Sequence, residues 1–141
     1  MALTSESTTV WTGTLFEGSG TTRLDSSKLA EFDVNWKARA EGEAGTTNPE
    51  ELLAAAHSAC FSMAFSLALV QAGYTPESIQ TTAAVTFQPG EGVTGSHLLV
   101  SARVPGIAEA EFERIAGDAK ANCPISKALA GTTITIEAEL A

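Results

Sequence analysis

The stretch NPEELLAAAHSACFSMAFSLALVQA, residues 48–72, decides the fold, because it predicts one long helix with no Asp, Glu, Lys or Arg from residue 52 onward. Asn48 is a favourable N-cap residue, and Pro49 suits the first helical position. Glu50 and Glu51 complement the positive end of the helix dipole, and Glu51 stands where a capping box places its acidic residue. Gly73 is a natural residue to end such a helix.

The apolar part of this helix, residues 52–72, is also long enough to cross a membrane. It is rich in Ala and Ser, it includes His57 and Gln71, and no Lys or Arg directly flanks it to set an orientation. We therefore predict a central buried helix of a water-soluble protein and no membrane partner. In a chain of only 141 residues, covering every face of that helix calls for a second subunit.

Short strands and helices surround the long helix in the predicted order β-β-β-α-β-β-α-α-β. This order indicates an α+β fold in one domain, residues 1–141, with sheets that combine distant segments. Alternating apolar and polar residues, turn residues and helical periodicity place the elements. The predicted strands are residues 10–16, 21–24, 32–36, 79–88, 97–104 and 132–140, and the two further helices are residues 108–121 and 125–129.

Charge and composition exclude several classes of protein. The chain has 8 Lys and Arg against 17 Asp and Glu, a formal net charge of −9, so a nucleic-acid partner is not expected. The first residues, MALTSESTTVW, lack the basic and apolar regions of a secretory signal, and we expect a cytoplasmic protein. There is no phosphate loop, nucleotide fingerprint, C-x-x-C or close His pair, and we expect no cofactor and no metal.

The two cysteines, Cys60 and Cys123, are the candidate reactive groups. By composition alone, Cys60 in the long helix reads as a small buried apolar residue. Cys123 precedes Pro124 at a predicted helix start, where unpaired N–H groups favour a thiolate. If the two thiols meet, one can attack a peroxide and the other can condense with the resulting sulfenic acid. The sequence does not supply the short separation that such a pair requires.

Cys60 is mid-helix, so its thiolate needs a cation from elsewhere, and Arg39 is the leading candidate. Glu50 could orient Arg39 through a bidentate ion pair. Glu50 and Cys60 are ten positions apart, nearly three turns on one helix face, and so do not touch. Both residues also have an interpretation without a catalytic role. Glu50 would then only stabilise the positive end of the helix dipole, and Arg39 would be a solvent-exposed residue at the end of a strand.

His57 lies one turn before Cys60 on the same face, so a Cys–His nucleophile pair is one interpretation. We favour the other, a core histidine satisfied by the backbone or by a partner such as Ser58. His97, in a predicted strand, is expected to be a surface or structural residue.

Two motifs in this order resemble the OsmC/Ohr superfamily. Residues 48–64, NPEELLAAAHSACFSMA, resemble its first-cysteine motif, and residues 122–129, NCPISKAL, resemble its second. The stretches VPGI, residues 104–107, and WTG, residues 11–13, also fit, and AHSACFSM is closer to the osmotically inducible branch than to the organic-hydroperoxide-resistance branch.

The resemblance implies a thiol-dependent peroxidase acting on organic hydroperoxides, with Cys60 as the attacking thiol and Cys123 as the resolving thiol. It implies that Glu50 and an arginine complete the site, and that a dithiol such as a lipoyl group is the reductant. The loop at residues 45–47 is one residue longer than the family spacing, so Arg23 in the first hairpin is the alternative to Arg39. The implied fold is an OsmC-like intertwined homodimer, with long central helices packed against antiparallel β-sheets and sites at the subunit interface.

Two other classes of function compete with the enzyme. One is a non-catalytic, stress-related dimer that binds an apolar ligand at its interface and keeps its cysteines inert. The other is a zinc-stabilised structural module, for which the ligand spacing is poor.

Overall fold

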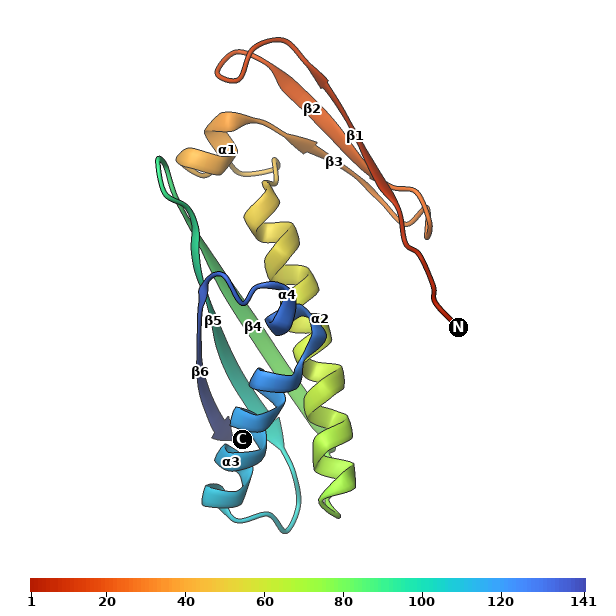
Figure 1. Cartoon of the computed structure of the whole chain (residues 1–141), viewed down its shortest axis with the longest axis vertical. Helices are drawn as coiled ribbons and strands as arrows, with labels where there is room; N and C mark the ends of the chain where they lie inside the picture. Colours follow the sequence, from red (N-terminus) through yellow and green to blue (C-terminus); the bar gives the residue numbers. More distant parts are fainter. The chain divides into compact units, whose positions relative to one another are not determined.

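The computed structural model describes all 141 residues, and the chain divides into two units, residues 1–52 and residues 53–141. The N-terminal unit contains a three-stranded antiparallel sheet in the order β1-β2-β3 (Figure 1). Its elements are β1 (Ser7–Thr12), β2 (Ser19–Leu24), β3 (Glu31–Val34), the short helix α1 (Trp36–Ala40) and the first residues of α2 (Pro49–Gln71).

Two predicted strands of this unit are too long at their C-terminal ends. The first ends at Thr12 because Gly13, at a φ of 93°, turns the chain before Leu15. The third ends at Val34, because the side chain of Asn35 accepts a hydrogen bond from the Ala38 N–H at 2.7 Å and caps a helix. Arg39 therefore lies on a helical turn, α1, and the interpretation of Arg39 as a strand end is wrong.

The C-terminal unit contains most of α2 and a second three-stranded sheet, β4-β5-β6. β4 and β5 are antiparallel, whereas β5 and β6 are parallel, so this sheet is mixed and not wholly antiparallel as predicted. A parallel pair needs a crossover connection, and α3 and α4 supply it. The elements are β4 (Ser78–Gln88), β5 (Gly92–Arg103), α3 (Glu109–Asn122), α4 (Pro124–Ala128) and β6 (Thr133–Leu140).

The long helix begins as the sequence predicts. The Asn48 side chain accepts a hydrogen bond from the Glu51 N–H at 2.8 Å, the N-cap bond expected for this residue. The Glu51 carboxylate, however, accepts from the Thr47 hydroxyl. The cap of α2 thus joins two consecutive loop residues, Thr47 and Asn48, to the first helical turn.

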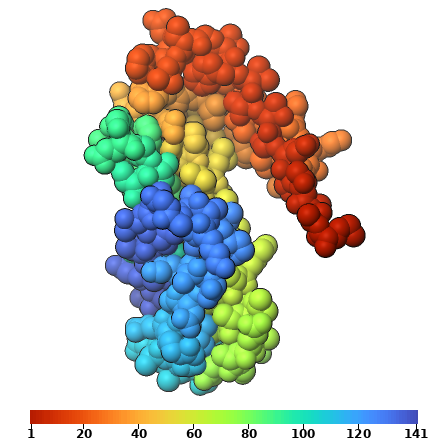
Figure 2. Space-filling view, in the orientation of Figure 1, coloured from red at the N-terminus to blue at the C-terminus, as the bar shows by residue number.

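One face of α2 is buried in the C-terminal unit and the opposite face is not. Phe61, Phe65 and Leu69 are fully buried, and their core partners come from β5 and α3: Leu98, Val100, Ala102, Phe112, Ile115, Ala116 and Ala119. Figures 1 and 2 show α3 and α4, in blue, beside the yellow-green α2. On the opposite face, Met63, Leu67 and Val70 are 55–74% exposed. Within a single chain, the predicted burial of α2 therefore holds for one face of the helix only.

α2 is also the one helix long and apolar enough, by length and composition alone, to cross a membrane. The core helix of a water-soluble protein passes the same test. Its packing against β5 and α3 through Phe61, Phe65 and Leu69 is the behaviour of a core helix.

Candidate active site

The two cysteines, 63 residues apart in the sequence, meet in the C-terminal unit. Both are free thiols, and their Sγ atoms lie 3.1 Å apart, within hydrogen-bonding distance. Cys60 comes from the middle of α2 and is partly buried, whereas Cys123 caps α4 and is fully buried. The pair therefore has the proximity that the sequence alone did not supply.

Local chain geometry places Cys123 at this point. The Cys123 N–H donates to the Ala119 carbonyl at 2.9 Å, so the residue closes α3. Pro124, which cannot continue that helix, starts α4 instead, and the Cys123 carbonyl accepts from the Lys127 N–H at 3.0 Å. Cys123 is thus fixed between two helices, with its backbone bonded on both sides.

The two thiols differ in acidity. Burial, together with the hydrogen bond to Cys123, raises the pKa of Cys60. Burial opposes ionisation of Cys123 as well, but the Ser126 N–H, the Cys60 thiol, the Ser126 hydroxyl and the Ile125 N–H outweigh it and lower the pKa of Cys123. Ionisation of Cys60 is therefore disfavoured in this environment, and a positive charge close to its sulfur would promote it.

His57 is fully buried one turn before Cys60 and is bonded on both sides. Its Nδ1 lies 2.7 Å from the Ser96 hydroxyl of β5, and its Nε2 lies 2.8 Å from the Ser126 hydroxyl of α4. The interpretation of a satisfied core histidine is confirmed, although Ser58 is not the partner, because its hydroxyl donates to the Ala55 carbonyl. Burial lowers the pKa of His57 and favours the neutral imidazole.

Arg39 and Glu50 form a largely buried ion pair in the N-terminal unit. The Arg39 Nη2 lies 2.9 Å from Glu50 Oε1, and Arg39 Nε donates to both carboxylate oxygens at 3.2 and 3.3 Å. The Glu50 side chain is 6% exposed and that of Arg39 is 32% exposed. The bidentate pair expected from the sequence is therefore present, and it fixes the guanidinium against the start of α2.

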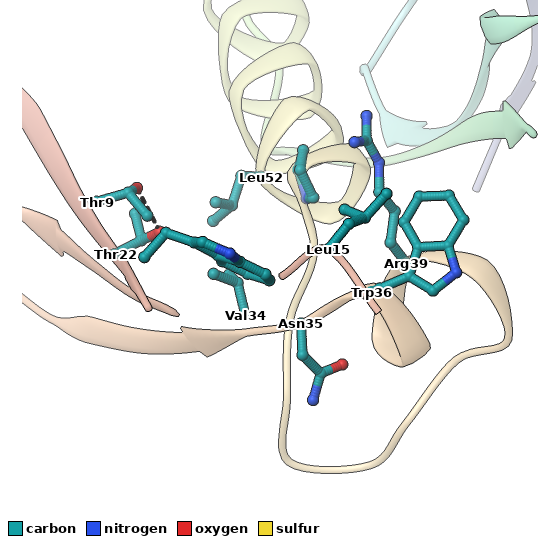
Figure 3. A pocket seen from close by; sticks show the side chains of 10 residues that line it. Thr9, Leu15, Thr22, Val34, Asn35, Trp36, Arg39 and Leu52 are labelled. Carbon is teal, nitrogen blue, oxygen red and sulfur yellow. Dashed lines mark hydrogen bonds between the residues drawn. The ribbon is translucent and has the colours of Figure 1, made fainter. Parts of the chain in front are cut away.

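An open pocket of about 520 Å³ lies beside Arg39 within the N-terminal unit. Figure 3 shows Leu15, Trp36 and Arg39 close together, and Leu52 and Val34 on another part of its wall. Trp11 also lines it, so both tryptophans of the chain belong to this pocket. Its walls are mainly apolar, with one guanidinium, which suits a ligand that combines an apolar group with a polar or anionic end.

Comparison with known proteins places this geometry in a family. The model described as OsmC-like protein matches residues 40–139. The chain is 44% identical to the peroxiredoxin OsmC of Escherichia coli strain K12 over 133 residues, 92% of each chain. It is 33% identical to the organic hydroperoxide resistance protein OhrA of Bacillus subtilis over 119 residues, 81% of this chain and 84% of the relative.

The chain belongs to the OsmC-like protein family. The crystal structure of an OsmC-like protein from Mycoplasma pneumoniae matches it with a TM-score of 0.73 at 19% identity, over 99% of both chains. The α+β class predicted from the element order and the OsmC-like fold with a long helix implied by the resemblance are thereby confirmed, and the fold contains two small sheets.

The structure brings the predicted residues of this OsmC-like chain together in two pairs: Cys60 with Cys123, and Arg39 with Glu50. Arg23, the alternative arginine, makes an ion pair with Asp25 at 2.7 Å, and its side chain is 55% exposed. His97 is partly exposed and bonded to the Thr135 hydroxyl at 2.6 Å, as expected of a structural residue.

Sequence reasoning did not identify Ser96 and Ser126 as members of the site. Ser126 lies inside the second-cysteine stretch, residues 122–129. It stands three positions after Cys123, the N-cap residue of a short helix, and this spacing was a usable signal that its side chain lies near the thiol. Ser96 carries no such signal, because its contact with His57 spans 39 residues and depends on how β5 packs against α2.

Proposed function

We propose that this chain is a thiol-dependent peroxidase that reduces organic hydroperoxides to alcohols. The observation that carries the proposal is the 3.1 Å separation of two free thiols, one partly and one fully buried. Two relatives that align with most of the chain are named peroxiredoxin OsmC and organic hydroperoxide resistance protein OhrA. The function fits both the names and the chemistry that paired cysteines perform.

In the proposed reaction, Cys60 is the attacking thiol and Cys123 the resolving thiol. The Cys60 thiolate attacks one peroxide oxygen, the O–O bond breaks, and the departing alkoxide takes a proton to become the alcohol. Cys60 is then a sulfenic acid. The Cys123 thiolate attacks its sulfur, the S–S bond forms, the S–O bond breaks, and the hydroxide takes a proton and leaves as water. A dithiol reductant, proposed to be of the lipoyl type, restores both thiols.

We also propose that Arg39 supplies the cation that Cys60 needs, with Glu50 as its positioning partner. Three observations support this role. The pKa of Cys60 is raised, so its thiolate requires outside stabilisation. Arg39 is held by a bidentate ion pair. Arg23, the alternative, is largely exposed and bound to Asp25.

The proposed working form is a cytoplasmic homodimer that acts without a metal or a cofactor. The exposed apolar stripe of α2 supports a second subunit, since an isolated chain would leave it in water.

The deciding experiment is a peroxidase assay with cumene hydroperoxide and dihydrolipoamide on the wild type, Cys60→Ser and Cys123→Ser. We expect loss of turnover in Cys60→Ser. In Cys123→Ser we expect one alcohol per subunit and a sulfenic acid that dimedone traps. Ser62→Ala, on the same helix, is the control for substitution in α2 and retains turnover. Full activity in Cys60→Ser would refute the proposal.

The pocket of the N-terminal unit favours a second candidate function, the binding of an apolar ligand without chemistry. Because Trp11 and Trp36 both line the pocket, tryptophan fluorescence reports its occupancy directly. Titration with 2-phenyl-2-propanol, the unreactive alcohol product, measures binding. Binding that persists in a wild-type protein without peroxidase turnover would favour this second function over the enzyme.

A further inference from the structure

The hydrogen bonds of His57 form a chain that ends at the resolving thiol. Ser96 on β5, His57 on α2 and Ser126 on α4 are linked at 2.7 and 2.8 Å. The Ser126 hydroxyl is in turn one of the groups that lower the pKa of Cys123. All four residues are at most 5% exposed. Water therefore does not compete for these bonds, and the orientation of each hydroxyl is set by its neighbours.

The tautomer of the neutral His57 imidazole sets which groups donate and which accept in these hydrogen bonds. When Nε2 carries the proton, it donates to the Ser126 oxygen, and the Ser126 hydroxyl is left to donate to Cys123. Nδ1 then accepts from the Ser96 hydroxyl. In the other tautomer, the Ser126 hydroxyl must donate to Nε2 and turns away from the sulfur. The tautomer of His57 thus decides whether the Cys123 thiolate receives a hydrogen bond from this serine.

We propose that His57, held by Ser96, is a positioning residue for the resolving step, and that it directs the Ser126 hydroxyl onto the Cys123 thiolate. The inference rests on the proposed function only in assigning Cys123 the resolving role. The same contacts join α2, β5 and α4 one turn from Cys60. They hold the sulfurs at 3.1 Å, from which closing a bond of about 2.0 Å is a short movement.

The surroundings of Cys123 support this assignment. The Cys60 sulfur lies 3.1 Å from the Cys123 sulfur, and His57 is linked to this region through its 2.8 Å hydrogen bond with Ser126. The Ser126 N–H and hydroxyl are both among the groups that stabilise its thiolate. Ser126 thus supplies two of the neutral donors that favour the Cys123 thiolate.

The first test measures the ionisation of Cys123 without any peroxide. In a Cys60→Ser background, the pH dependence of alkylation by iodoacetamide gives the pKa of Cys123. We expect Ser126→Ala to raise it by about one unit and Ser126→Thr, which keeps the hydroxyl, to leave it nearly unchanged. An unchanged pKa in Ser126→Ala, or an equal increase in Ser126→Thr, would overturn the assignment.

The second test follows His57 itself by nitrogen NMR, which distinguishes the two tautomers. In the reduced protein, we expect the Nε2–H form to grow as Cys123 ionises, and this change to vanish in Cys123→Ser. A histidine with a purely structural role keeps one tautomer through that titration, and that result would overturn the proposal. Both readouts are independent of peroxidase turnover, so failure of the proposed function is distinguishable from failure of this inference.

The third test isolates the resolving step in the wild-type Cys60–Cys123 pair. After one equivalent of cumene hydroperoxide, dimedone competes with Cys123 for the Cys60 sulfenic acid. At neutral pH, Ser126→Ala should slow disulfide formation about tenfold and increase dimedone labelling accordingly. Equal labelling in Ser126→Ala and the wild type would contradict the role of the serine.

Discussion

At the scale of single residues, His57 makes the stability of the protein depend on pH. Burial lowers its pKa in the folded state, whereas in the unfolded chain it titrates near 6.5. Between those two values the unfolded state binds more protons, so stability falls as the pH decreases below about 6.5. The contribution is complete above that pH and changes by at most about 1.4 kcal/mol per pH unit.

His57→Gln should therefore flatten this dependence, even though the variant is less stable at every pH. Urea unfolding between pH 8 and pH 5.5 measures how the unfolding free energy of the wild type and of the variant changes with pH. This range lies above that in which most carboxylates titrate. A variant with the same slope as the wild type would show that His57 is protonated equally in the folded and unfolded states.

Arg39 and Glu50 form a residue pair whose energetic coupling can be measured. Removing Arg39 leaves the Glu50 carboxylate, on a side chain that is 6% exposed, without its three hydrogen bonds to the guanidinium. We expect Arg39→Ala to cost about 1–3 kcal/mol of unfolding free energy, moderated by the partial exposure of the arginine. Arg39→Ala combined with Glu50→Gln should recover part of that loss, because no buried charge is then left unpaired.

Lys37→Ala is the matched control for this pair. Lys37 lies on the same short helix, its side chain is 65% exposed, and its contact with Glu43 is 3.8 Å long. We expect a change below about 0.5 kcal/mol. Additive losses in the Arg39 and Glu50 variants would contradict the coupling.

At the scale of elements, the N-cap of α2 is a separable contribution to stability. Asn48 accepts from the Glu51 N–H at 2.8 Å and donates to the Ala38 carbonyl at 3.0 Å, so it joins α2 to α1. Asn48→Ala should cost about 1–2 kcal/mol in urea unfolding. Asn122→Ala, at the exposed end of α3, is the control and should change stability by less than about 0.5 kcal/mol. Similar losses of unfolding free energy in Asn48→Ala and Asn122→Ala would show that the N-cap of α2 contributes no more stability than an exposed asparagine.

The same elements show what the sequence could predict. Local signals were sufficient for α2, since Asn48, Pro49 and Gly73 mark its ends in the chain itself. They were not sufficient for α1, because five residues are too few for helical periodicity and the turn depends on the Asn35 cap and burial of Ala38. The parallel pairing of β5 and β6 is also non-local, because the crossover through α3 and α4 sets it.

The candidate site divides in the same way. The cysteines could be predicted, because each lies in a contiguous motif, and the Arg39–Glu50 pair could be predicted because the two residues are only 11 positions apart and have complementary charges. The link from Ser96 through His57 to Ser126 could not, since it joins three elements separated by 39 and 69 residues. Serine has too many ordinary roles for its position in a sequence to identify a partner.

At the scale of the whole molecule, the exposed face of α2 predicts association of two chains. Met63, Leu67 and Val70 repeat at helical spacing, so they form one apolar stripe, and each is more than half exposed. Burying such a stripe contributes about 25 cal/mol per Å² of apolar surface removed from water. We expect a homodimer by light scattering at micromolar concentration.

Leu67→Glu tests that stripe at its centre. A charge placed there must be desolvated on association, so we expect the variant to elute as a monomer or to form aggregates instead of a defined dimer. Ala110→Glu, at an exposed position of α3, introduces the same charge elsewhere in the C-terminal unit and should leave the dimer intact. A wild-type protein that is monomeric and fully active at micromolar concentration would contradict the prediction, because α2 would then function with its apolar stripe in water.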